Sequence, residues 1–320
     1  MSVFGKLLYK FYFQPKSKQV LIKKFGGKAN YLSMLTAEQE MKFYALNELT
    51  IESNFNSNGK FKINFLTGDN LIHQTLFCTY SFFKFLTWEQ SSDFSVYYYS
   101  DGTLSSETID ILNVKFPQIN IVGIDETMLV IRKNLPNESF PYLNKKIDTL
   151  PLFKKLAFTH VGNTGLSTFF DSDMLFLKKP VAFLRWLQEE GGISSNAFCI
   201  QDVVRSYSYT NSEILKLYPK QVEHNINSGM YSIHSENMNF EFIEKLIREF
   251  HNNFGSRYYM EQLITAIILE KAKKLFIAPQ LEYIVLPNDE QIQNQKGTLH
   301  HYVNESKRLY FQESWKKQMC

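Results

Sequence analysis

Short apolar runs that alternate with helical patterns constrain the fold of this chain more than any other feature. Runs of strand length, rich in aromatic and branched residues, occur at Phe61–Thr67, Phe94–Tyr99 and Ile119–Ile124, and helical stretches separate them. Such alternation is typical of a parallel sheet that helices cover on both faces. The sequence therefore predicts an α/β protein with a Rossmann-like sheet.

Small and acidic residues follow these three strands. Thr67 is followed by Gly68 and Asp69, the second strand runs into Asp101, and the third ends at Asp125. Ligands of open α/β sheets bind outside the carboxyl ends of the strands. A ligand site is therefore expected at this edge.

The chain divides into two expected regions. Residues 1–60 form an N-terminal arm and a helix that opens at the capping-box sequence beginning with Thr36 and ends near Leu49. The polar run 52–60 is interpreted as a linker to one domain of residues 61–320, in which Asp69 is expected to cap the first helix. The other expected elements are strands at Ser167–Phe170, Asn196–Ile200 and Ile226–Ile233, and helices to about Lys115 and at Leu152–His160, Met238–Phe250 and Glu261–Lys273.

Composition excludes several classes of protein. Of the 320 residues, 44% are hydrophobic, which is enough to bury a core and excludes a disordered chain. The net charge of +3 is too balanced for a dedicated nucleic-acid binder. The three cysteines Cys78, Cys199 and Cys320 are far apart, which argues against a disulfide framework or a structural zinc and fits a reducing compartment. With neither a membrane-spanning run nor a signal peptide recognised, a cytoplasmic protein is expected.

The N-terminal arm is strongly basic. Residues 1–37 contain seven lysines and no acidic residue before Glu38, so the rest of the chain carries a net charge of −4. Aromatic residues lie among these lysines between Phe4 and Phe13. Residues 1–35 are therefore a candidate for peripheral attachment to the anionic inner face of a membrane. The alternative is an arm that packs its aromatic rings on the core and leaves its lysines in solvent.

The strongest local signal is the pair Asp171 and Asp173, which follows the strand ending at Phe170 and precedes Met174. Two carboxylates among bulky apolar residues are costly unless a cation compensates them. Hard oxygen ligands at this spacing suit Mg²⁺ or Mn²⁺ and, through the ion, a diphosphate. A solvated turn is the alternative, and the position at a strand end makes the metal site about as good an interpretation as the turn.

Three further motifs follow along the chain. His301, six residues before Lys307, could supply a third metal ligand and a cation for phosphates, and the alternative is a charged surface tail. Asn227-Ser228-Gly229 is a polar turn, with an ordinary loop whose glycine supplies a positive φ as the alternative. Glu261-Gln262 opens a helix, where an acidic residue is commonly just a favourable N-terminal charge.

In this order the four motifs resemble those of the family 8 glycosyltransferases, which are retaining enzymes of the GT-A fold. Members of that family show a strand-borne Asp-x-Asp, an Asn-Ala/Ser-Gly turn, an Asp-Gln pair on a helix and a late His-x-x-Gly-x-x-Lys. The resemblance covers residues 61–310, with Glu261 in place of the aspartate and Asn304 in place of the glycine. It implies a mixed, GT-A-like sheet flanked by helices, with residues 1–60 as an N-terminal helical extension.

The resemblance also implies roles for individual residues. Asp171, Asp173 and His301 would hold Mn²⁺ or Mg²⁺, and Gln201 and Asp202 are candidates for sugar hydroxyls, with a surface turn as the alternative. Gln262 would stabilise the oxocarbenium-like centre of a retaining reaction, whereas Glu261 would be the general base of an inverting one. The residues implied to bind the donor are Thr67, Gly68, Asp69, Asp101, either Lys154 or Lys155, Ser172, Asp202, Asn227 and Lys307.

The implied function is that of a hexosyltransferase that moves a sugar from a nucleotide sugar, expected to be a UDP-sugar, to a hydroxyl acceptor. The acceptor is expected to be a saccharide or lipid-linked, as in the synthesis of cell-surface glycans or glycolipids. A haloacid-dehalogenase-like phosphohydrolase is a second class, but that family expects a threonine where this chain has Leu175. A non-catalytic scaffold on a membrane surface is a third class, which leaves the paired carboxylates unexplained.

Overall fold

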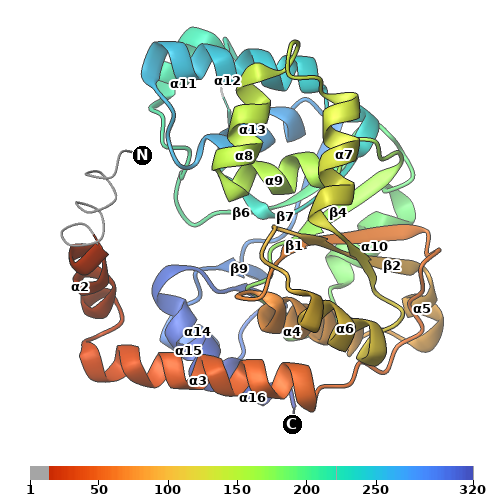
Figure 1. Cartoon of the computed structure of the whole chain (residues 1–320), viewed down its shortest axis with the longest axis vertical. Helices are drawn as coiled ribbons and strands as arrows, with labels where there is room; N and C mark the ends of the chain where they lie inside the picture. The colour runs from red at the N-terminus through yellow and green to blue at the C-terminus, as the bar shows by residue number, and fades with distance from the viewer. Residues whose placement is uncertain (1–13, 221, 320) are drawn as a thin grey trace.

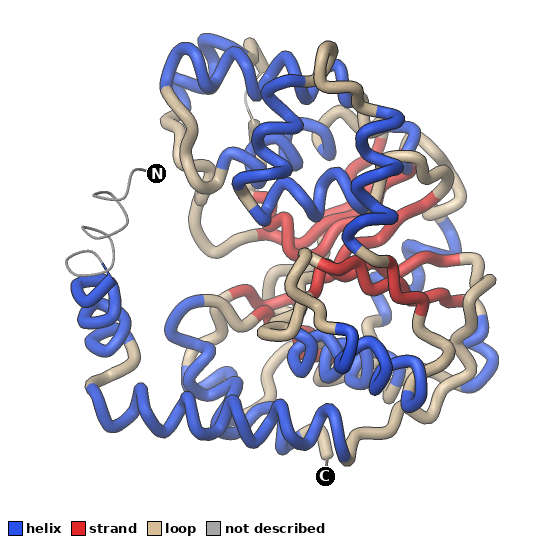
Figure 2. The backbone as a smooth tube through the Cα atoms, viewed as in Figure 1, coloured by secondary structure: helices blue, strands red, loops and turns tan. Residues whose placement is uncertain are grey.

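A seven-stranded sheet forms the centre of the computed structural model, which describes residues 14–220 and 222–319 (Figures 1 and 2). The strands lie in the order β3-β2-β1-β4-β7-β6-β8. Their bounds are β1 Phe61–Thr67, β2 Phe94–Ser100, β3 Asn120–Val122, β4 Leu166–Phe170, β6 Asn196–Gln201, β7 Ile226–His234 and β8 Lys274–Ile277.

The sheet is mixed, as the resemblance implies, and not wholly parallel, as the alternation of strands and helices alone suggests. Strands β3, β2, β1 and β4 are mutually parallel, whereas β7 is antiparallel to both β4 and β6. Thr67 pairs with Ser100, and Phe170 pairs with Met230. The carboxyl ends of β1, β2 and β4 therefore meet the amino-terminal half of β7 at one edge of the sheet.

Helices cover both faces of the sheet, because alternate strand side chains point into two separate cores. In β4, Phe170 packs into one core and Phe169 into the other. The helices of the Phe170 face include α4 Ile72–Phe83, α6 Ser106–Lys115 and α10 Val181–Glu189. The helices of the Phe169 face include α7 Ile124–Asn134, α8 Pro141–Thr149, α9 Pro151–Phe158, α11 Asn211–Leu217, α12 Phe240–Phe254 and α13 Met260–Leu269. The predicted α/β architecture is confirmed.

A second, three-stranded sheet brings the C-terminal segment to the Asp-x-Asp sequence. Strand β10 (Leu299–His301) lies between β5 (Met174–Phe176), to which it is antiparallel, and β9 (Tyr283–Val285), to which it is parallel. His301 pairs with Met174, and the Tyr302 N–H donates to the Asp173 carbonyl at 2.8 Å. This pairing places His301 beside Asp173, although 128 residues separate them.

The N-terminal helices pack against the C-terminal segment. Helices α2 (Gln14–Lys24) and α3 (Lys28–Asn47) precede the sheet, and α3 lies along the short C-terminal elements in Figure 1. These elements are α14 Asp289–Gln293, η3 Asn304–Ser306, α15 Lys307–Leu309, the π-helical turn η4 Tyr310–Ser314 and α16 Trp315–Lys317. The aromatic stretch before residue 14 lies outside the described residues. Among the described helices, none has the length and apolar content needed to cross a bilayer.

Two expected helix starts and one expected strand end are wrong. Helix α3 begins at Lys28 rather than at Thr36, whose hydroxyl donates to the Leu32 carbonyl inside the helix instead of capping it. Helix α4 begins at Ile72, and the Asp69 carboxylate accepts from the N–H and hydroxyl of Ser105 rather than capping α4. Strand β3 ends at Val122, so the following acidic residue, Asp125, lies in the first turn of α7.

Candidate active site

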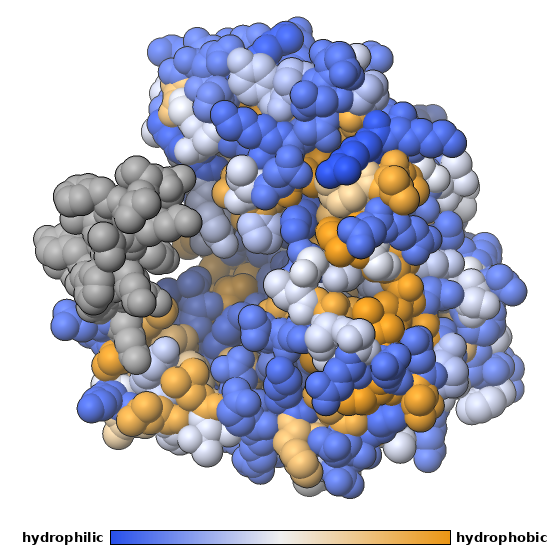
Figure 3. Space-filling model, viewed as in Figure 1, coloured by the Kyte–Doolittle hydropathy of each residue, from blue (hydrophilic) through white to orange (hydrophobic). Residues whose placement is uncertain are grey.

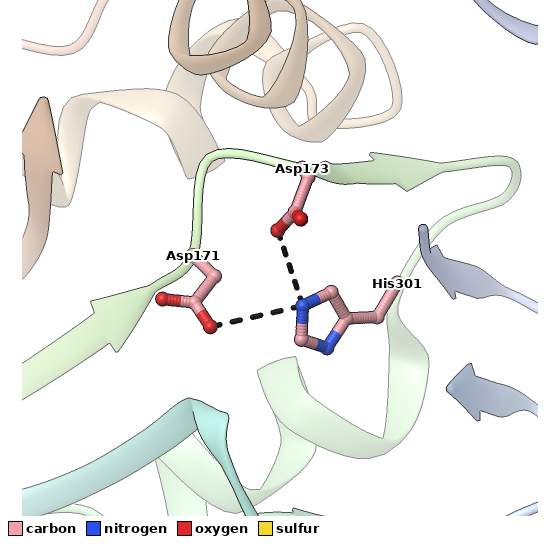
Figure 4. Close-up of side chains that lie close together, drawn as sticks. All are labelled: Asp171, Asp173 and His301. Carbon is pink, nitrogen blue, oxygen red and sulfur yellow. Dashed lines mark hydrogen bonds and ion pairs between the residues drawn. The ribbon is translucent and has the colours of Figure 1, made fainter. Parts of the chain in front are cut away.

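The Asp-x-Asp sequence and the histidine of β10 form one cluster. His301 Nε2 lies 3.1 Å from Asp173 Oδ1 and 3.7 Å from Asp171 Oδ2 (Figure 4). One ligand atom from each residue can be chosen so that all three lie within 4.8 Å of one another. Two carboxylates and an imidazole are suitable ligands for a divalent cation. The structure thus brings together the three residues expected to hold the metal.

Gly229 leaves room for this cluster. A Cβ atom at this position would lie 2.5 Å from His301 Cε1 and 2.7 Å from Asp171 Oδ2. Such contacts are far too short, so a side chain here would displace the cluster. The φ angle of Gly229 is outside the positive range, and the alternative that this glycine serves a left-handed turn is therefore wrong. The absence of a side chain at Gly229 lets His301 and Asp171 approach each other closely enough to share one cation.

Lys155 links the cluster to the helix α13. Its side chain is almost fully buried, and Nζ lies 3.7 Å from Asp171 Oδ1 and 3.6 Å from Glu261 Oε2. Nζ also donates to the carbonyl and hydroxyl of Ser228 at 3.1 and 2.9 Å. Burial by itself would lower the pKa of Lys155, but the two carboxylates outweigh it and raise the pKa above its ordinary value. Lys155 therefore remains a buried cation.

Lys307 places a second cation on the other side of Asp173. Its Nζ lies 3.0 Å from Asp173 Oδ2, while His301 faces Oδ1 of the same carboxylate. Burial would raise the pKa of Asp173, but Lys307 and His301 outweigh it and lower the pKa. Asp173 is therefore ionised, as a metal ligand must be.

The two residues that open α13 have different environments. Both carboxylate oxygens of Glu261 accept hydrogen bonds. Oε1 accepts from the hydroxyl of Thr265 at 2.8 Å, and Oε2 accepts from the hydroxyl of Ser228 at 3.1 Å. Gln262 Nε2 donates to Asp202 Oδ2 at 3.0 Å and to the Ile226 carbonyl at 3.2 Å. The carbonyl oxygen Oε1 is the remaining polar atom of the Gln262 side chain.

These residues line a cavity of about 310 Å³, within the size range of small-ligand sites. Figure 3 shows the surface hollowed between the half of the molecule that carries α13 and the half that carries α14 and α15. Several lining residues have no role predicted from the sequence: Val203, Val204, Ser206, Tyr258, Tyr259 and Leu286. The predicted residues that line it are Lys155, Asp171, Asp173, Asp202, Asn227, Glu261, Gln262, His301 and Lys307.

The other residues expected at the donor lie outside this cavity lining. Thr67 and Ser172 are buried, and the hydroxyl of each lies 2.8 Å from the Thr75 hydroxyl. Lys154 Nζ donates to the Asp101 carbonyl at 2.5 Å. A Cβ atom on Gly68 would lie 2.3 Å from Asp101 Oδ1, which shows how closely the loops after β1 and β2 approach each other. Gln201, at the end of β6, is also outside the cavity lining.

Comparisons with known proteins identify the fold. No protein-family model and no curated protein matches the sequence. The apo structure of mouse xyloside xylosyltransferase 1 is similar, with a TM-score of 0.52 and 10% identity over 75% of this chain and 96% of that one. Galactosyltransferase LgtC, solved with donor and acceptor sugar analogues, gives a TM-score of 0.49 and 10% identity over 80% and 96%. The bifunctional glycosyltransferase WbbM also gives 0.49, with 12% identity over 85% and 53%.

At 10% identity, the likeness to the xylosyltransferase shows the fold alone. The chain has the GT-A fold of glycosyltransferases, as expected from its motifs. Membership of family 8 stays a prediction.

Proposed function

We propose that this chain is a metal-dependent glycosyltransferase that transfers a hexose from a nucleotide sugar, expected to be a UDP-sugar, to a hydroxyl group. One observation carries the proposal: Asp171, Asp173 and His301 meet on the wall of a ligand-sized cavity in a GT-A fold. One fold hosts many activities, so the function depends on the residues of the site rather than on the fold.

The residues present fit a divalent cation. The Asp171, Asp173 and His301 side chains converge from two segments, and Gly229 keeps the space beside them clear. The imidazole favours Mn²⁺, because Mg²⁺ prefers oxygen ligands. When bound, the cation supplies positive charge that stabilises the departing diphosphate.

Lys155 and Lys307 place two ammonium groups beside the carboxylates of the site. Lys307 is ion-paired with Asp173, and its ammonium would turn to the donor diphosphate when Asp173 serves as a ligand of the cation. Lys155 stays between Asp171 and Glu261 and holds both carboxylates in position. Lys155, rather than Lys154, is therefore the residue of this pair that we assign to the site.

The contacts of Glu261 and Gln262 favour a retaining reaction. Glu261 has both oxygens engaged and Lys155 beside it, so it suits a holding role better than that of a general base that takes a proton from an acceptor. Gln262 has its amide nitrogen fixed by Asp202, which leaves Oε1 to stabilise positive charge on the sugar. The acceptor would then attack from the face of the leaving group.

Donor binding and donor hydrolysis test the proposal without a known acceptor. Thermal melting with nucleotide diphosphates and their sugars should show stabilisation by UDP that requires Mn²⁺. Asp173→Asn keeps the shape of the side chain and should abolish this stabilisation, whereas Asp110→Asn, on the exposed face of α6, should leave it unchanged. Equal stabilisation by UDP in Mn²⁺ and in EDTA would contradict the metal role.

Membrane attachment and a saccharide or lipid-linked acceptor are a separate part of this proposal. On α2, Val20 and Leu21 are exposed next to Lys23. A lysine near an anionic surface contributes ~1 kcal/mol to binding, so residues 1–35 could hold the enzyme at its acceptor. Co-sedimentation with anionic vesicles, but not with neutral ones, is the expected result. Equal sedimentation with both kinds of vesicle would contradict the attachment.

A further inference from the structure

The segment that carries Lys307 is built from pieces too short to be stable alone. After β10 it consists of η3, α15, η4 and α16, each of three to five residues. Isolated helices of this length do not form in water, so contacts with the rest of the protein must fix their geometry. The position of the Lys307 ammonium, 3.0 Å from Asp173, depends on those contacts.

Helix α3 supplies contacts along the second half of this segment. Gln312 Nε2 donates to Ser33 Oγ at 3.0 Å, and Lys316 Nζ lies 2.7 Å from Glu40 Oε2. The Tyr44 ring packs on Trp315 with their centroids 5.5 Å apart. Figure 1 shows α15 and α16 lying beside α3. The N-terminal extension therefore supports the C-terminal segment.

Lys24, the last residue of α2, reaches the turn just before Lys307. Its Nζ donates to Asn304 Oδ1 at 2.8 Å and lies 3.4 Å from Glu305 Oε2. Asn304 has a φ of 54°, the left-handed conformation that asparagine tolerates better than other residues with a side chain.

This turn is also where the chain departs from the motif it resembles, which has a glycine in place of Asn304. Asparagine keeps the left-handed conformation open and adds an oxygen that Lys24 binds. The residue that differs from the motif, Asn304, thus accepts a hydrogen bond from Lys24 of the N-terminal extension, 280 positions away in the sequence.

We propose that the N-terminal extension is a functional part of the active site, in which Lys24 is a positioning residue that holds the Asn304 turn and thereby places Lys307 for the donor diphosphate. The role of Lys307 toward the diphosphate rests on the proposed function. The coupling of Lys24 to the turn rests on the contacts alone.

A double-mutant cycle tests the coupling. Lys24→Met removes the donor of the hydrogen bond, and Asn304→Gly removes its acceptor while allowing the same φ. Each change should lower kcat/KM for Mn²⁺-dependent hydrolysis of a UDP-sugar by about tenfold. The double variant should be no worse than Lys24→Met alone, because both changes remove the same hydrogen bond and only Lys24→Met also removes the contact with Glu305. Lys24→Arg should restore most of the loss. Lys133→Met, at an exposed lysine in the last turn of α7 and outside residues 1–35, should match the wild type.

A second measurement needs no enzymatic activity. Amide hydrogen exchange of residues 303–309, measured on the full chain in EDTA, should be faster in Lys24→Met than in Lys133→Met. Equal exchange in the two variants, or losses of kcat/KM that multiply in the double variant, would overturn the inference. Faster exchange in a protein that does not bind UDP with Mn²⁺ would support the coupling and refute the proposed function instead.

Discussion

A single methyl group on Gly229 should disable the metal site while leaving the fold in place. In Gly229→Ala the new Cβ would lie 2.5 Å from His301 Cε1, and the ring must retreat by about 0.9 Å to restore the ordinary contact of 3.4 Å. Metal–ligand distances tolerate only about 0.2 Å of error, so His301 would leave the coordination sphere. We expect a loss of roughly 10- to 100-fold in Mn²⁺ affinity, which corresponds to about 1.4–2.8 kcal/mol.

Calorimetric titration of Mn²⁺ with and without UDP measures this loss, and melting in EDTA separates it from the cost of overpacking, about 1–3 kcal/mol. Gly192→Ala is the matched control, because a Cβ at Gly192 meets no atom within 4 Å and this glycine is exposed. Wild-type Mn²⁺ affinity in folded Gly229→Ala would refute the reasoning about this cluster.

Three further predictions concern buried polar groups. Lys155→Met should reduce donor hydrolysis by about 100-fold, whereas Lys154→Met should cost less than about fivefold, and comparable losses would contradict the assignment. Glu244→Ala should lower the free energy of unfolding by about 2 kcal/mol in urea titrations, because its carboxylate accepts the N–H groups of Tyr142 and Leu143 that open α8. Burial lowers the pKa of His160 to about 3. Below pH 6.5 the imidazole of His160 therefore binds a proton in the unfolded chain but stays neutral in the folded chain. Stability should therefore fall as the pH falls through this window, by about 2 kcal/mol at pH 5 for this group, and His160→Gln should flatten the slope in urea titrations at several pH values.

The fold and the metal cluster are predictable because their signals are local. The run Phe61–Thr67 has the length and apolar content of a buried strand, and its predicted bounds are those of β1. Asp171 and Asp173 are recognisable as a pair because apolar residues flank them. The resemblance to the late His-x-x-Gly-x-x-Lys motif predicts the role of His301, and the residues of this motif also lie within one short segment.

Features that depend on packing between distant segments are not predictable in this way. Neighbouring helical residues point about 100° apart, so only the packing of α9 on the sheet decides that Lys155 and not Lys154 faces Asp171. The capping-box sequence at Thr36 misplaces the start of α3, because the same residues also fit a helix interior. The bond from Lys24 to Asn304 joins residues 280 positions apart, and no local pattern indicates it.

The most direct test of the central claim is an anomalous difference map at the manganese edge, from crystals grown with Mn²⁺ and UDP. The account predicts a peak within bonding distance of a carboxylate oxygen of Asp171, a carboxylate oxygen of Asp173 and Nε2 of His301, with the diphosphate beside Lys307. A nucleotide bound in this cavity with no manganese at the three side chains, or manganese bound only elsewhere, would contradict it.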